Sequence, residues 1–179
     1  MVSAAFSAGL LEQALDTDVN LVNAEVLLKD RGIELVDERL TEIGDFSNLI
    51  TAEVLSNERA ALAAGTLFGH KMPRLVQKGD FRLESPMEGT LMLTSHQDTP
   101  GVIGKIGEVC GRYQVNIAYL SVGRSTLAPG GEAMGVLVLD STPPPAALAE
   151  IERLEPILGV WIVNFPPAGQ LPRWLGGTE

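Results

Sequence analysis

Apolar positions recur at helical spacing near the start of the chain. Most residues between positions 3 and 15 are apolar, which predicts a helix that needs neighbours on several sides. A turn is expected at residues 16–18, and Asn20 is placed to cap a second helix over residues 21–30, with Gly32 closing it. Because so apolar a first helix starts abruptly, we expect the chain to begin within a larger domain.

Further along, the period of the apolar positions shortens towards alternation, which predicts strands. The predicted strands cover residues 33–40, 49–55, 60–68, 74–77 and 81–83. Turn-forming pairs such as Gly44-Asp45 separate them. Together with the two helices, these elements predict a small α+β layer with an antiparallel sheet over residues 1–84, which ends at a joint formed by Ser85-Pro86.

Residues 89–165 have a clearer rhythm of strand, helix, strand, strand, helix and strand. The expected strands are 90–95, 116–122, 133–139 and 158–165, and the expected helices are 102–110 and 146–154. A βαββαβ order of this size is typical of the ferredoxin-like fold, in which two helices cover one face of a four-stranded antiparallel sheet. Residues 166–179 lack periodicity and predict a tail or an oligomer contact. The predicted fold class of the whole chain is α+β.

Composition narrows the possible partners. The formal charge of −10, from 13 basic and 23 acidic residues, argues against nucleic acid and against an anionic membrane surface. No run of 18 apolar residues predicts a membrane span. A single cysteine excludes an intramolecular disulfide and fits a reducing cytoplasm, which is the expected location.

Candidate binding chemistry lies where a predicted strand ends and a helix begins, in the run Ser95–Gly104. Pro100 occupies the expected first helical position, and the free amides of Gly101, Val102 and Ile103 would hold a carboxylate. Asp98 could then bind the ammonium group of the same ligand, and the side chain of Asn116 can both donate and accept hydrogen bonds. The alternative is structural: Asp98 or Thr99 caps the helix, and Asn116 ties down a loop.

Other chemistries are poorly supported. Gly101, Gly104 and Gly107 do not have the spacing of a nucleotide-binding loop, and we attribute them to close packing of the helix on the sheet. The two histidines, His70 and His96, are far apart, so no metal site is predicted. Cys110 falls on the apolar stripe of the helix and is expected to be an inert core residue. No catalytic residue is assigned.

Four basic residues lie within a dozen positions of this acidic chain: Lys71, Arg74, Lys78 and Arg82. The simpler explanation is a solvated face. The functional alternative is a phosphate-binding site formed by Lys71, Arg74 and Arg82.

Six runs of the chain are informative when taken together: Asp18-Val19-Asn20-Leu21-Val22-Asn23-Ala24, Lys29-Asp30-Arg31-Gly32-Ile33-Glu34, Ala64-Gly65-Thr66-Leu67-Phe68-Gly69, Thr99-Pro100-Gly101-Val102-Ile103-Gly104, Val115-Asn116-Ile117-Ala118 and Val122-Gly123-Arg124. They resemble runs of D-3-phosphoglycerate dehydrogenases. The first half is similar to the intervening domain of these enzymes and the second half to the ACT domain that ends them.

The resemblance implies a division into a partial, truncated α/β intervening domain at residues 1–84, an ACT domain at residues 89–165 and a tail at residues 166–179. It implies allosteric feedback control of serine biosynthesis, with L-serine bound between paired ACT domains. By position, His96, Asp98 and Asn116 match the serine-contacting residues, and a second anion site in the intervening domain would involve Lys71, Arg74 and Arg82. The chain would form dimers or tetramers.

The resemblance also implies that catalysis and NAD belong to other domains of the parent enzyme, so no cofactor and no dehydrogenase activity are expected of these residues alone. Two alternatives remain open: an ACT sensor for another amino acid, and an oligomerisation scaffold that binds no ligand.

Overall fold

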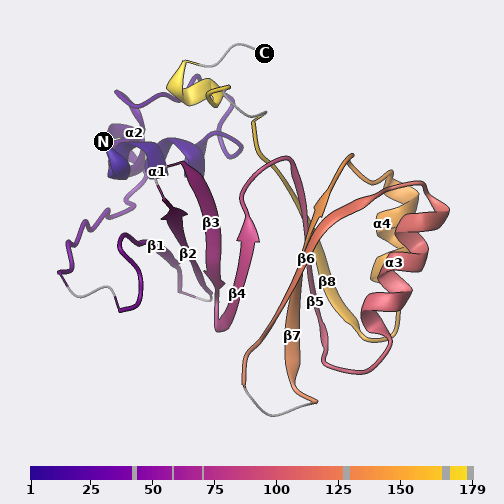
Figure 1. Ribbon diagram of the computed structural model, residues 1–179. Coiled ribbons are helices and arrows are strands. Elements are labelled where there is room, and N and C mark those ends of the chain that lie inside the picture. The colour runs from indigo at the N-terminus through magenta and orange to yellow at the C-terminus, as the bar shows by residue number, and fades with distance from the viewer. Residues whose placement is uncertain (42–43, 58, 70, 127–129, 167–169, 177–179) are drawn as a thin grey trace. The chain divides into compact units, whose positions relative to one another are not determined.

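The computed structural model spans residues 1–179 and describes all of them except 42–43, 58, 70, 127–129, 167–169 and 177–179. Two compact units are present, one formed by residues 1–44 with 168–179 and the other by residues 45–167 (Figure 1). His70, considered above, lies outside the described residues. No helix in the described part of the chain is long and apolar enough to cross a membrane.

The smaller unit is helical. It contains α1 (Val2–Leu11), α2 (Ala24–Asp30) and a short 3-10 helix, η1 (Arg173–Leu175). Its core is a cluster of five buried apolar residues, with Trp174 packed against it: Ala8, Leu11, Val19, Ala24 and Leu28. The described part of the C-terminal segment therefore contributes a core contact to this unit.

Helix α2 begins later than the sequence predicts. The side chain of Asn20 accepts hydrogen bonds from the amides of Val22 and Asn23, and Asn23 Oδ1 accepts one from the Asn20 amide in return. These bonds hold residues 21–23 in a turn, so the regular helix starts at Ala24 rather than at residue 21.

The predicted strand at residues 33–40 is wrong, because these residues form no regular element. Ile33, Val36 and Leu40 are exposed, and charged residues lie between them. Alternating apolar residues stabilise a strand only when a neighbouring strand pairs with it and one face is covered.

The larger unit begins with an antiparallel meander of four strands, here called the first sheet. Its strands are β1 (Ile50–Leu55), β2 (Ala60–Phe68), β3 (Met72–Lys78) and β4 (Phe81–Pro86), in the order β1-β2-β3-β4. These four strands confirm the predictions for residues 49–83. The register shifts once in the pairing of β2 with β3 and once in the pairing of β3 with β4.

A second sheet follows, with the predicted βαββαβ order. It consists of β5 (Thr90–Gln97), α3 (Val102–Arg112), β6 (Ile117–Arg124), β7 (Glu132–Leu139), α4 (Pro145–Glu152) and β8 (Ile157–Asn164). The strand order is β6-β7-β5-β8 and every pairing is antiparallel. Helices α3 and α4 lie on one face of this sheet (Figure 1), where they enclose the main core with Met92 and Leu137. The predicted ferredoxin-like fold is confirmed.

The other face of the second sheet is also apolar, and the first sheet covers it. Buried residues of β5 and β7 contact residues of the first sheet such as Leu75, Phe81 and Leu83. Ser85 and Pro86, the predicted joint, are buried at the end of β4. The compact units thus divide at residues 44–45, whereas the boundaries of the two sequence domains remain a prediction.

The glycines of α3 do not serve the purpose predicted for them. A Cβ added at Gly101, Gly104 or Gly107 would meet no atom within 4 Å, so these positions face open space rather than the sheet. Close approach occurs instead at Gly123 on β6, where an added Cβ would lie 2.4 Å from the backbone oxygen of Arg82 on β4. Only glycine lets these two strands lie so close together.

This contrast predicts opposite effects of two alanine substitutions. Gly123→Ala should lower the free energy of unfolding by about 1–3 kcal/mol, because the backbone of β4 has to move. Gly104→Ala should raise it by up to about 1 kcal/mol, because alanine favours a helix and meets nothing there. Urea denaturation followed by circular dichroism measures both; equal effects of the two variants would contradict the close β4–β6 contact.

Candidate ligand site at the end of strand β5

Asp98 lies directly after β5, in a loop held by backbone contacts. Its amide donates to the carbonyl of Gly131 at 2.7 Å. Its carboxylate forms an ion pair with Arg124, the last residue of β6, with 2.7 Å between Oδ2 and Nε. The alignment of these atoms does not meet hydrogen-bond geometry, and Oδ2 has no other hydrogen-bond donor. Asp98 is therefore fixed in place but not fully satisfied.

Helix α3 begins without a side-chain cap. Its N-cap is Gly101, whose φ of 91° is the left-handed conformation that glycine adopts without strain. The helix starts at Val102, so Pro100 precedes the cap instead of occupying the first helical position as predicted. Neither Asp98 nor Thr99 caps the helix, and its first turn contains no acidic residue. The first amides and the positive end of the helix dipole are thus available to an anion.

His96 is the penultimate residue of β5 and is almost fully buried, with 2% of its surface exposed. Its Nδ1 lies 3.0 Å from the carbonyl of Gln97, while Nε2 has no hydrogen-bond partner among the described residues. A buried ring nitrogen without a partner costs free energy unless a ligand or water supplies one.

Asn116 is not near these residues within one chain. It precedes Ile117, which pairs with Leu139, and Leu139 in turn pairs with Thr90. His96 and Thr90 lie at opposite ends of β5, six positions apart, which separates them by roughly 20 Å. The Asn116 side chain donates to Asp140 at 2.7 Å, so it ties down a loop in the free chain.

An open groove of about 1130 Å³ lies beside the Asp98–Arg124 pair. Its lining comes from β3, β4, β6 and the adjoining loops: Gln77, Asp80, Arg82, Asp98, Val122, Arg124, Ser125 and Thr126. Sequence reasoning did not assign Arg124 a role, because its proximity to Asp98 depends on the register of β6 against β7. The only sequence signal was its place in the Val122-Gly123-Arg124 run.

The predicted basic cluster does not converge. Arg74 pairs with Glu84 at 3.2 Å and lies over the ring of Phe68. Arg74 pairs across the sheet with Pro86, four positions from Arg82 on β4, which separates the two arginines by about 13 Å. Lys71 is exposed in the turn before β3, at the far end from Arg82. The three cations form no common site in this chain.

Glu84 also joins the two sheets. It accepts a hydrogen bond from Tyr119 Oη on β6 at 2.7 Å, and this bond, with a smaller contribution from burial, raises the pKa of Tyr119. The Glu84 amide donates to Ser121 Oγ on the same strand. Arg74 therefore stabilises the contact between β4 and β6, and its charge is already matched.

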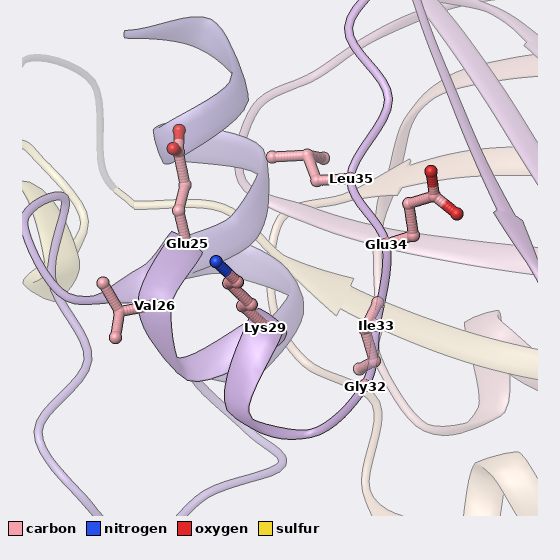
Figure 2. A pocket seen from close by; sticks show the side chains of 7 residues that line it. All are labelled: Glu25, Val26, Lys29, Gly32, Ile33, Glu34 and Leu35. Carbon is pink, nitrogen blue, oxygen red and sulfur yellow. The ribbon is translucent and has the colours of Figure 1, made fainter.

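A second groove, of about 600 Å³, lies in the smaller unit. Figure 2 shows that Glu25, Val26 and Lys29 of α2 line it together with residues 32–35 of the following segment. Two carboxylates and one ammonium border it, and no buried polar group points to a ligand there. It contains none of the predicted site residues.

Cys110 is buried on the inner face of α3. Removal from water raises the pKa of its thiol, because burial disfavours the charged thiolate. The described residues contain no group of three His, Cys, Asp or Glu that could hold a metal ion.

Comparison with known proteins agrees with this architecture. The profile of the D-3-phosphoglycerate dehydrogenase intervening domain matches residues 1–78, and the ACT domain profile matches residues 90–156. The D-3-phosphoglycerate dehydrogenase of Archaeoglobus fulgidus is 33% identical over 164 residues, which are 92% of this chain and 31% of that protein. The Synechocystis enzyme is 34% identical over 157 residues, 88% of this chain and 28% of the enzyme.

This chain belongs to the D-3-phosphoglycerate dehydrogenase family. It spans less than a third of the length of these relatives, and the matched part is their regulatory region, an intervening domain followed by an ACT domain. The catalytic and NAD-binding parts of a D-3-phosphoglycerate dehydrogenase are not among these 179 residues. The predicted family is confirmed, while the assignment of individual ligand-binding residues stays a prediction.

The state of Cys110 gives a direct check of the α3 packing. A buried thiol with a raised pKa should not react with a disulfide reagent such as DTNB at pH 8 in the folded protein, and one thiol per chain should react after unfolding in guanidinium. Absorbance at 412 nm reports the reaction. Fast labelling of the native protein would mean that α3 opens or packs differently.

Proposed function

We propose that this chain is an amino-acid-sensing regulatory module whose ACT domain binds L-serine at a site shared by two copies, for feedback control of a D-3-phosphoglycerate dehydrogenase. The observation that carries the proposal is the uncapped start of α3 beside Asp98. Family membership supports it, because ACT domains of these dehydrogenases generally bind amino acids and self-associate.

The site suits a small zwitterion. The α-carboxylate of serine would lie on the first amides of α3, where the N-terminal dipole favours negative charge. The ammonium would lie on the Asp98 carboxylate, and the buried Nε2 of His96 would gain a partner.

Two copies are needed to bring Asn116 to the ligand. Strands β6 and β8 are the edges of the second sheet, and Leu120 and Val122 on β6 are exposed. If two β6 strands lie antiparallel across a twofold axis, the start of one strand meets the end of the other. Asn116 of one copy would then lie close to Asp98 and Arg124 of the other.

In a full-length enzyme, serine would act by preferring one disposition of the paired domains. It can shift the balance between two dispositions only by its difference in affinity for them. Oxidation of 3-phosphoglycerate with NAD would be carried out by parts outside these 179 residues.

A ligand-free scaffold is the second candidate. It is favoured by the ion pair of Asp98 with Arg124 and the bond of Asn116 to Asp140, which leave both side chains occupied in the free chain. A scaffold would self-associate to the same degree with and without amino acids, whereas a sensor would bind them.

Calorimetric titration with L-serine tests the proposal, with D-serine and glycine as controls. We expect saturable binding that is selective for L-serine. Asp98→Ala should weaken it about tenfold or more, because a charge-assisted contact is lost. Unchanged affinity would remove the ammonium contact, and no heat at millimolar serine would favour the scaffold.

A mixing experiment tests the shared site. Asp98→Ala and Asn116→Ala chains should each bind poorly, yet an equal mixture should regain about a quarter of the sites, because random dimers place one intact Asp98 opposite one intact Asn116. Asp140→Ala serves as the control that releases Asn116 without removing it. No recovery on mixing would contradict a site built from two chains.

A further inference from the structure

The contact proposed for the ligand's ammonium is already occupied by a cation of the chain itself. Arg124 Nε lies 2.7 Å from Asp98 Oδ2. Asp98 is largely buried, with 17% of its side chain exposed, whereas half of the Arg124 side chain is exposed. An exposed arginine at the end of an edge strand can swing away, while the carboxylate stays where the loop holds it.

The groove beside this pair has a balanced set of charges. Asp80 and Asp98 supply two carboxylates, and Arg82 and Arg124 supply two guanidinium groups. Arg82 forms no ion pair or side-chain hydrogen bond with any residue that the structure describes. A simple cation would have to displace Arg124 and leave it without a partner, and a simple anion would leave Asp98 paired. A zwitterion satisfies both members of the pair at once.

We propose that Arg124 is both the internal competitor for the amino-acid site and a carboxylate ligand within it: the ammonium of the incoming amino acid replaces Arg124 on Asp98, and the released guanidinium binds the α-carboxylate. This inference rests on the proposed function and adds a specificity residue to it. The exchange breaks one ion pair and forms two, and the planar guanidinium can hold a carboxylate with two parallel hydrogen bonds.

The exchange discriminates against amines that lack a carboxylate. Such a ligand would break the Asp98–Arg124 pair and offer the arginine nothing in return. Removal of Arg124 should therefore affect two ligand types in opposite directions. If the ion pair were purely structural, removal of Arg124 would change the affinities for both ligand types in the same direction or not at all.

Calorimetric titration of the full 179-residue chain with L-serine and with ethanolamine tests this. Ethanolamine keeps the ammonium and the hydroxyl group but has no carboxylate. We expect Arg124→Gln to weaken L-serine binding by about tenfold or more, through loss of a charge-assisted contact. The same change should strengthen ethanolamine binding several-fold, because Asp98 becomes free.

Arg112→Gln is the matched control. Arg112 also sits in ion pairs, with Glu108 and Glu150, and its side chain is 47% exposed against 50% for Arg124, but it lies on α3 outside the groove. The Arg112→Gln substitution should leave the affinities for L-serine and for ethanolamine unchanged. If the Arg124→Gln variant does not fold, Arg124→Lys replaces it, because lysine keeps the charge. The lysine variant should bind L-serine more weakly than the wild type, and its affinity for ethanolamine should stay low.

Three results separate the possibilities. Opposite shifts for the two ligands support the proposal. Equal losses for both, or unchanged serine affinity in a folded variant, overturn the role of Arg124 and leave serine sensing intact. If the wild-type chain binds neither ligand, the proposed function itself fails, and the role of Arg124 fails with it.

Discussion

The second sheet is apolar on both faces, and the arrangement of the larger unit depends on covering both of them. Helices α3 and α4 cover the face that contains Met92 and Leu137. The opposite face, with Leu91 and Val136, would expose a large apolar area to water if the first sheet did not pack on it. This packing brings β4 against β6 and explains why Gly123 has no room for a side chain. It also places Arg82 beside the groove next to Asp98.

Much of the fold could be predicted because helical and strand periods change clearly along residues 89–165. Prediction failed where tertiary context decides: residues 33–40 alternate but have no strand to pair with, and the α3 glycines face open space. The candidate site was only partly predictable. A free helix start after Asp98 follows from local sequence, whereas the distance to Asn116 and the nearness of Arg124 follow from strand register, which no local pattern contains.

The register has a consequence for how a ligand could be sensed. Asp98 and Asn116 lie at opposite ends of the second sheet, so one copy offers only part of the proposed site. A ligand that needs both residues binds only the paired chains. Its binding free energy therefore stabilises the pair relative to the separate chains. Sensing and association are then one equilibrium, and neither requires a change of fold within the chain.

Strand β6 would connect that equilibrium to the first sheet. Arg124 at its end contacts Asp98, while Tyr119 on the same strand donates to Glu84, which also pairs with Arg74. If a ligand releases Arg124 from Asp98, the end of β6 loses its tie to the β5 loop but keeps its tie to β4. Strand β6 would then move together with the first sheet more than with the β5 loop. Because linkage is reciprocal, any displacement of β4 that favours the released state must also raise the affinity for the ligand by the same factor.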